Sequence, residues 1–268
     1  MNARNMTVMT FNLRRQSAED EGNAWTYRKG YAAEVVKRYR PTVAGTQEGL
    51  RDMLEDLDRE LPDYGRVGEG RNGGTENEYN AIYYRKEELA VRDWGQFWLS
   101  EYPSEPRLMS WGATHHRICT WAHFQYRDEP QKQFLHYNTH LDHRSQLARV
   151  KGSVLLWERM SEHRNRLELP ALLTGDMNAE PDNPVIAFWR GQSEASGVPC
   201  TLKDAYSVLT GSPGRSFHGF KGGEEGGPID YIFVTPDVRV EGVAIIRDRF
   251  DGKHPSDHYP VLAKIRLE

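Results

Sequence analysis

Acidic, amide and imidazole side chains recur in six short segments of this sequence, each at the edge of an apolar, strand-like run. Carboxylate and amide oxygens suit hard divalent cations, and an imidazole beside a carboxylate suits proton transfer. Strand ends are where a rigid sheet presents such groups to a loop-lined cleft. The segments are Thr10-Phe-Asn12, Gln47-Glu48, Asn138-Thr-His140, Gly175-Asp-Met-Asn178, Ile229-Asp-Tyr231 and Ser256-Asp-His258.

Taken one at a time, most of these segments also suit ordinary structural roles. Asn12 after a strand suits a turn, and Glu48 suits the cap of a following helix. His140 suits a semi-buried histidine whose hydrogen bonds are satisfied. Asp230 is harder to explain in this way, because it lies in an apolar run and a buried carboxylate is costly unless a cation, a histidine or a metal ion accompanies it. Function therefore has to be argued from the whole set of segments and their order along the chain.

The elements that must position these segments follow from the periodicity of apolar residues. Strand patterns cover residues 6–12, 42–46, 79–84, 89–98, 118–126, 133–141, 171–174, 228–235, 240–246 and 259–267. Helical spacing predicts helices at residues 27–39, 50–61, 146–163 and 185–189. Pro41 should end the first helix, and Ser145 should cap the third. Residues 68–77 form a glycine-rich polar loop, and residues 100–116 form an irregular segment.

The order of these elements predicts an α/β fold in which two mixed β-sheets pack face to face with helices outside. This arrangement buries every apolar face that the pattern contains. One half of the pattern ends near Tyr126, and the second half has a similar element order. No linker rich in proline, serine or glycine separates the halves, so we expect a single domain over residues 1–268.

The composition limits where the protein works and what it contacts. The sequence contains no run of about 18 apolar residues, which is the length that a helix needs to span a bilayer. The N-terminal segment lacks the features of a secretory signal, and we expect Cys119 to be a buried free thiol in a reducing cytoplasm, with only Cys200 as a second cysteine. Proteins that track long nucleic-acid duplexes usually have a basic surface, so the formal net charge of −4 argues against that role. No obligate protein partner is implied.

The six segments, in this order, resemble the motifs of the endonuclease/exonuclease/phosphatase superfamily, which includes deoxyribonuclease I. The resemblance runs from Thr10 to Val261, and the stretch Asn-Thr-His-Leu-Asp-His is most similar to the bacterial phosphatase-like and deadenylase-related branches. It implies a four-layer α/β/β/α sandwich. It also implies metal-dependent hydrolysis of a phosphate ester by an activated water. The expected substrate is a small phosphorylated molecule such as a sugar phosphate; the alternative is a nuclease that acts on short RNA or single-stranded DNA.

The resemblance also implies a metal site. Mg²⁺, with Mn²⁺ as the alternative, would bind as one or two ions, because hard cations prefer oxygen ligands. Glu48 is expected to be a direct ligand, with Asn12 beside it through its oxygen or a bound water. Asp257 is the next candidate ligand, far along the chain but expected nearby in the fold.

Five further residues have catalytic roles by the same resemblance. Asp176 would orient or deprotonate the attacking water, and Asn178 would hold that water or the phosphate. Asp230 would fix the ring of His258, which would act either as a general base or as a cationic phosphate clamp. His140 would donate to a phosphate oxygen or to the leaving group. A catalytically silent binding module would have lost at least one expected residue, and all are present.

Residues that shape the substrate site are predicted more broadly. Arg28 could reach the phosphate, or it could lie on a solvated helix face. Arg117 opens a strand that should lead through the cleft, where it would contact a phosphate. Trp111 could stack on a base or a sugar ring, although tryptophan more often packs in a core. His218 in a glycine-rich loop could approach the substrate, or the segment could simply be a flexible loop. His143 could line the rim.

Overall fold

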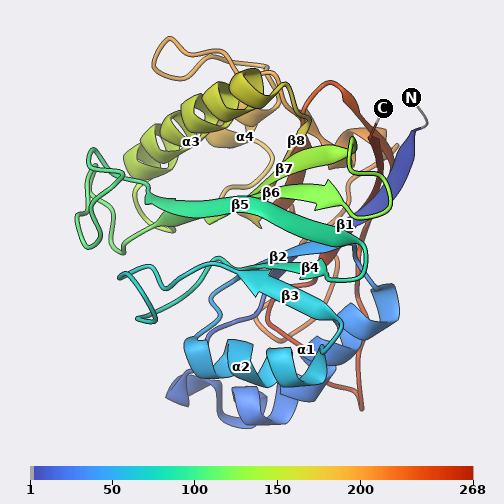
Figure 1. The fold of residues 1–268 in the computed structure, drawn as a ribbon. Coiled ribbons are helices and arrows are strands. Elements are labelled where there is room, and N and C mark those ends of the chain that lie inside the picture. The colour runs from blue at the N-terminus through green and yellow to red at the C-terminus, as the bar shows by residue number, and fades with distance from the viewer. Residues whose placement is uncertain (1–2, 268) are drawn as a thin grey trace.

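The computed structural model describes residues 3–267, which form two six-stranded β-sheets (Figure 1). The first sheet has the order β11-β12-β1-β2-β4-β3, and the second has the order β5-β6-β7-β8-β10-β9. Both are mixed, because β1 is parallel to β2 and β7 is parallel to β8, whereas the other neighbouring pairs are antiparallel. The strands are β1 (Arg4–Asn12), β2 (Val43–Gln47), β3 (Tyr64–Val67), β4 (Ile82–Arg85), β5 (Leu89–Trp98), β6 (Ile118–Tyr126), β7 (Gln133–His140), β8 (Ala171–Asp176), β9 (Lys203–Asp204), β10 (Asp230–Val234), β11 (Val238–Ile245) and β12 (Val261–Leu267).

Helices cover the outer faces of the two sheets and complete a four-layer α/β/β/α sandwich, which confirms the predicted fold. In Figure 1, α1 and α2 lie on the outer side of the first sheet, and α3 and α4 lie on the outer side of the second. Ser145 caps α3 as predicted, because its Oγ accepts a hydrogen bond of 3.1 Å from the N–H of Ala148. The helices are α1 (Trp25–Tyr39), α2 (Arg51–Glu60), α3 (Gln146–Leu167) and α4 (Pro184–Trp189), with 3₁₀ turns η1 (Ala18–Asn23) and η2 (Ala205–Val208).

The two sheets are in tight contact near the ends of their parallel strands. A Cβ added at Gly45 of β2 would lie 2.2 Å from Thr174 Oγ1 of β8 and 2.5 Å from Asn138 Oδ1 of β7, so only glycine fits there. Asn138 Nδ2 donates to the Thr46 carbonyl oxygen at 2.8 Å, and Gln47 Nε2 donates to Asn138 Oδ1 at 2.8 Å. These buried hydrogen bonds join the sheets directly beneath the ends of β2, β7 and β8.

The structure corrects the predicted division of the chain into halves near Tyr126. The chain leaves the first sheet between β4 and β5, because β5 and β6 pair with each other as the edge of the second sheet. It returns to the first sheet with β11 and β12, which pair next to β1. Two short edge strands, β3 and β9, were not predicted, because neither is long enough to display a periodic pattern.

Two simpler expectations can be compared with the described residues. Within residues 3–267, no helix combines the length and the apolar character that crossing a membrane requires. Cys119 is a free, buried thiol, as predicted, and Cys200 is also free and buried. Burial raises the pKa of both thiols, which keeps them protonated at neutral pH.

Candidate active site

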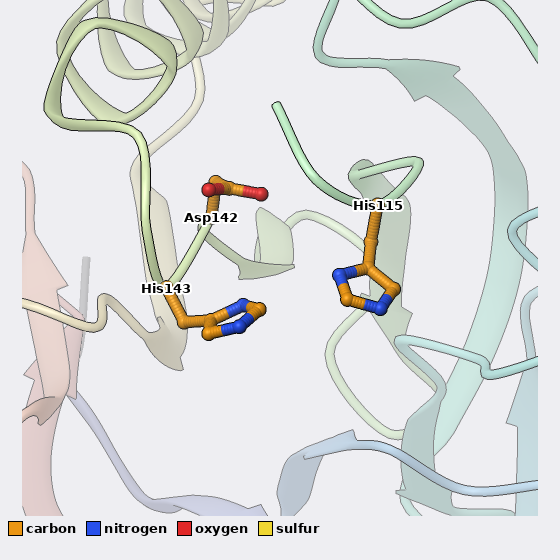
Figure 2. A group of neighbouring side chains, drawn as sticks. All are labelled: His115, Asp142 and His143. Atoms are coloured by element: carbon orange, nitrogen blue, oxygen red, sulfur yellow. The ribbon is translucent and has the colours of Figure 1, made fainter. Parts of the chain in front are cut away.

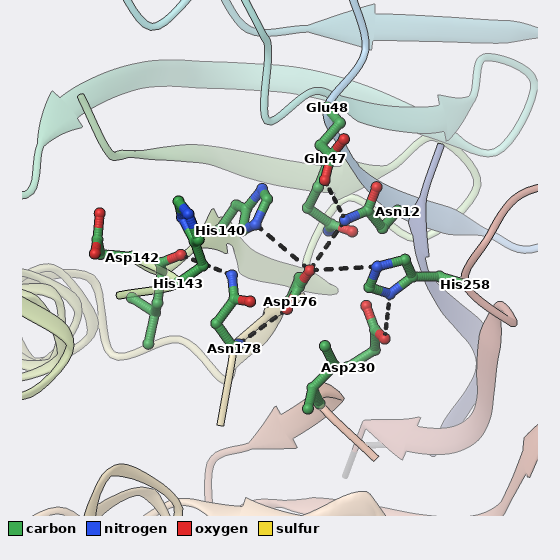
Figure 3. A network of polar contacts seen from close by, with 12 residues as sticks. Asn12, Gln47, Glu48, His140, Asp142, His143, Asp176, Asn178, Asp230 and His258 are labelled. Atoms are coloured by element: carbon green, nitrogen blue, oxygen red, sulfur yellow. Dashed lines mark hydrogen bonds and ion pairs between the residues drawn. The ribbon is translucent and has the colours of Figure 1, made fainter. Parts of the chain in front are cut away.

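A cleft of about 360 Å³ lies where strands of both sheets end (Figure 3). Asn12 ends β1, and Glu48 follows the parallel strand β2. His140 and Asp176 end the parallel strands β7 and β8 and are register partners. Asp230 opens β10, which is antiparallel to β8, so it lies opposite Asp176. The strand directions therefore bring five predicted site residues from both sheets to one place.

Asn12 links the carboxylates of the two sheets. Its Nδ2 donates to Glu48 Oε1 and to Asp176 Oδ2, both at 3.0 Å, while its Oδ1 accepts from the N–H of Arg14 at 2.9 Å. The amide nitrogen, not the oxygen, thus faces the carboxylates. In this arrangement Asn12 holds the candidate ligands in position and does not itself present a ligand atom.

Glu48 is held in a conformation that few glutamates adopt. Its φ of 62° lies in the left-handed region, where a non-glycine residue is strained and the strain is often found at functional sites. Its Oε2 accepts from the backbone N–H of Arg15 at 3.0 Å. Burial favours the neutral form, but the hydrogen bonds from Arg15 and Asn12 outweigh it and hold the pKa of Glu48 below its usual value. Glu48 is therefore anionic at neutral pH.

Asp230 and His258 form a buried pair at the other side of the cleft. His258 Nδ1 lies 2.8 Å from Asp230 Oδ2, and His258 Nε2 lies 3.8 Å from Asp176 Oδ2. Burial alone would lower the pKa of His258, but the Asp230 carboxylate outweighs this and raises it to about 10. The pair predicted from the sequence is thus in contact, and it keeps the imidazole of His258 cationic at neutral pH.

Asp176 lies between the two groups just described. Its Oδ1 accepts from the N–H of Asn178 at 2.9 Å, and its Oδ2 lies 3.4 Å from His140 Nε2. Burial, and next the charge of Asp230, raise the pKa of Asp176 to about 7. Burial and the nearby arginines Arg117 and Arg71 lower the pKa of His140 well below its usual value. Asp176 can therefore take up a proton near neutral pH, and His140 is neutral.

The donor set of the cleft fits a hard divalent cation. Glu48, His140 and Asp176 each offer a ligand atom within 4.8 Å of the others. Asp257 also lines the cleft. Burial and the negative charge of Glu48 raise its pKa, although the positive charge of His258 opposes them. Crowded carboxylates of this kind repel one another, and a bound cation removes that repulsion. Glu48, His140 and Asp176 are the residues whose ligand atoms lie close enough to hold it, while Asp257 lines the same cleft and stays a predicted ligand.

Four arginines add positive charge to the cleft: Arg14, Arg15, Arg71 and Arg117. Arg117 was predicted, and its buried Nε has no hydrogen-bond partner within residues 3–267. The other three were missed. Arg14 and Arg15 lie two and three residues after Asn12, and this short distance along the chain was the available signal. Arg71 lies in the glycine-rich loop and donates to Glu78 Oε2 at 2.7 Å.

Arg28 needs correction, because its side chain is not among the residues that line the cleft. The guanidinium is buried and forms hydrogen bonds with the backbone instead. It donates to the carbonyl oxygens of Leu13, Arg14, Asn23 and Pro255. Arg28 thus joins the segment after β1 to the segment before His258 and acts as a positioning residue.

Replacing Arg28 by methionine keeps much of its apolar volume but leaves buried carbonyls unpaired. We expect the free energy of unfolding to fall by roughly 3 kcal/mol, measured by urea denaturation. Lys29→Met is the matched control, because the Lys29 ammonium is on the surface beside Asp56, and it should change stability little. A stable Arg28→Met protein with a raised KM for a phosphate ester would instead support a contact between Arg28 and the substrate.

Trp111 and His218 also need correction, since neither lines the cleft. Trp111 belongs to a left-handed turn with φ of 57°, and its carbonyl oxygen accepts from Ser145 Oγ at 2.7 Å. His218 is buried with its ring centroid 4.0 Å from that of Tyr259. Trp111 therefore connects the irregular segment to the start of α3, and the His218 side chain packs against Tyr259.

The fold and this carboxylate–imidazole cleft define a hydrolase of phosphoester bonds. The family model for the Endonuclease/Exonuclease/phosphatase family matches residues 9–258, and the chain belongs to that family. The comparison with curated protein sequences gave no significant match.

Solved structures of similar proteins agree with this assignment. An endonuclease/exonuclease/phosphatase family protein from Bacteroides thetaiotaomicron is 31% identical, with 100% of this chain and 96% of that chain covered and a TM-score of 0.91. A mannosyl-6-phosphatase from the same species is 31% identical, with 97% and 99% covered and a TM-score of 0.88. The human Nocturnin catalytic domain, at 17% identity, 98% and 96% coverage and a TM-score of 0.75, shares the fold.

Proposed function

We propose that this protein is a metal-dependent phosphatase that acts on a small phosphorylated substrate such as a sugar phosphate. The observation that carries the proposal is the meeting of two groups in one cleft. Glu48 and Asp257 provide anionic oxygens for a cation, and the Asp230–His258 pair provides a fixed positive charge beside Asp176. Phosphate ester hydrolysis needs both an activated water and positive charge on the phosphate oxygens.

The residues of the cleft divide the reaction among them. When bound, a divalent cation supplies Lewis-acid charge and lowers the pKa of a coordinated water. Asp176 accepts a proton from the attacking water, for which its raised pKa is suitable. His258, kept cationic by Asp230, binds a phosphate oxygen, so we infer a clamp and not a general base. His140 Nε2 and the Arg117 guanidinium donate hydrogen bonds on the side of the leaving group.

Two observations support a small substrate over the nuclease alternative. The cleft volume of about 360 Å³ lies at the lower end of the range for small-molecule sites. The mannosyl-6-phosphatase from Bacteroides thetaiotaomicron is similar to this chain over nearly its whole length. We also propose that the chain acts as one domain and works in the cytoplasm, where its buried thiols stay reduced.

Metal removal and a substrate screen test this proposal together. Protein stripped with a chelator should lose all turnover of hexose phosphates, and added Mg²⁺ or Mn²⁺ should restore it. Hexose phosphates, nucleotides and short oligonucleotides should be compared by kcat/KM, with Glu48→Gln protein as the control for contaminating phosphatases. Full activity in the chelated protein would refute the metal dependence, and a preference for oligonucleotides would establish the nuclease.

A further inference from the structure

Two histidines that line the cleft face each other at its rim (Figure 2). His115 comes from the irregular segment between β5 and β6, and His143 comes from the turn between β7 and α3. Their ring centroids are 5.3 Å apart. Both side chains are largely exposed, and neither has a role in the reaction described above. We call this pair the rim histidines.

A buried carboxylate holds both sides of the rim in place. Asp142 Oδ1 accepts from the backbone N–H groups of Arg144 and Ser145, at 3.0 and 2.7 Å. Asp142 Oδ2 accepts from the N–H and the hydroxyl of Thr114, at 3.0 and 3.1 Å. The carboxylate thus joins the residue before His115 to the residues after His143, and fixes the spacing of the two rings.

These hydrogen bonds also determine which nitrogen of His115 carries the proton. The hydroxyl of Thr114 has one hydrogen, and it donates that hydrogen to Asp142 Oδ2. The hydroxyl oxygen of Thr114 lies 3.2 Å from His115 Nδ1, and because its hydrogen is already donated to Asp142, it must be the acceptor in that contact. His115 Nδ1 therefore carries the proton, and His115 Nε2 is left with a lone pair as a hydrogen-bond acceptor.

His143 is fixed in the opposite tautomer. Arg117 Nη2 lies 3.2 Å from His143 Nδ1, and a guanidinium can only donate. His143 Nδ1 is thus an acceptor, which places the ring proton on Nε2. Partial burial and the charges of Arg71 and Arg117 lower the pKa of His115 to about 4, and partial burial and Arg117 lower that of His143. Both rings are neutral at neutral pH.

The surroundings of the rim do not favour a second metal ion, although Asp142 and the rim histidines lie close enough to hold one. Both oxygens of Asp142 already accept hydrogen bonds from N–H or O–H groups. The permanently charged guanidinium of Arg117 lies 3.8 Å from Asp142 Oδ2 and touches His143. A cation at this position would meet repulsion from Arg117.

We propose that the rim histidines form a hydroxyl-recognition site for the alcohol part of the substrate. A hydroxyl group both donates and accepts, and the rim offers one acceptor, His115 Nε2, and one donor, His143 Nε2–H. The inference rests on the proposed phosphatase function and extends it: the preferred substrate is the phosphate ester of a polyol, with a free hydroxyl within reach of the rim when the phosphate lies at the catalytic end.

The test compares two substrates that differ in hydroxyl groups. His115→Ala and His143→Ala should each lower kcat/KM for a hexose 6-phosphate about tenfold, mainly through KM. Neither variant should change kcat/KM for phenyl phosphate, which has no free hydroxyl. Thr114→Val should reproduce the effect of His115→Ala, because His115 loses the partner that sets its tautomer, whereas Thr114→Ser keeps the hydroxyl and should retain the wild-type preference.

The outcomes separate this inference from the function on which it rests. If the wild-type protein hydrolyses neither ester, the proposed function fails. If it hydrolyses both, but the rim variants lose the two activities equally or lose neither, the rim does not recognise hydroxyl groups and the phosphatase function stands. Retention of the wild-type preference by Thr114→Val would show that the tautomer assignment of His115 is wrong.

Discussion

Glu48→Gln protein is expected to be folded and almost inactive. Glutamine has the shape of glutamate and can still accept a hydrogen bond from Arg15, but it lacks the negative charge that would hold a cation next to the attacking water. Loss of an outer partner of a metal ligand typically costs about 10–100-fold, and we expect loss of the ligand itself to cost at least about 10³-fold in kcat. The measurement is kcat for a hexose phosphate at saturating Mg²⁺, with the Mg²⁺ concentration dependence.

Glu55→Gln provides the matched control for this variant. Glu55 is on the exposed face of α2, where it pairs with Arg51 at 2.8 Å, and its neutralisation should leave turnover and Mg²⁺ dependence unchanged. Both variants should unfold near the wild-type temperature. Near wild-type turnover in Glu48→Gln, with an unchanged Mg²⁺ requirement, would exclude Glu48 as a ligand.

Asp230→Asn should produce the second large effect, and its pH dependence identifies the role of His258. In the wild-type protein the Asp230 carboxylate raises the pKa of His258, so the imidazole remains cationic through neutral pH. As a clamp, His258 is active when protonated, and activity is lost as the pH rises through its pKa. Without the carboxylate that pKa falls, so the alkaline limb of the pH–rate profile should move to lower pH. At pH 8 we expect a loss of about 10²–10⁴-fold.

The opposite sign would hold if His258 were a general base. Its active form would then be the neutral imidazole, and lowering its pKa would increase the active fraction near neutral pH. A rise in the relative activity of Asp230→Asn at pH 6–7 would therefore contradict the clamp. His258→Ala is the comparison for Asp230→Asn. It should also lose the rate, but the alkaline limb of its remaining activity should not move to lower pH.

Most of the fold could be predicted because long, apolar elements display their period in the sequence. The ranges of β5 and β6 were predicted to the residue, and the parallel strands β2 and β8 differ only at their ends. Sheet membership could not be predicted in the same way. Pairing between β12 and β1 joins residues more than 250 positions apart, and no local pattern encodes that distance.

The candidate site was predictable where a residue is fixed to a strand end. Asp176 and Asp230 are register partners, so the strands alone decide their positions. Loop residues follow different rules, because tertiary contacts decide where their side chains go. Arg28 was placed at the substrate although the backbone carbonyls around it use its guanidinium. His115 was missed because its position depends on the bond between Thr114 and Asp142.

The tight packing at Gly45 has a consequence for how the enzyme can diverge. In the proposed mechanism Glu48 and Asp257, which would hold the cation, and Asp176, which would accept the proton, come from different sheets. The reaction geometry would then depend on the separation between two layers that leave no room for a methyl group at Gly45. Drift in that separation would disable the chemistry for every substrate at once. Selectivity, if the rim histidines recognise the substrate as proposed, would depend on peripheral loops that can be exchanged without altering the distance between the layers.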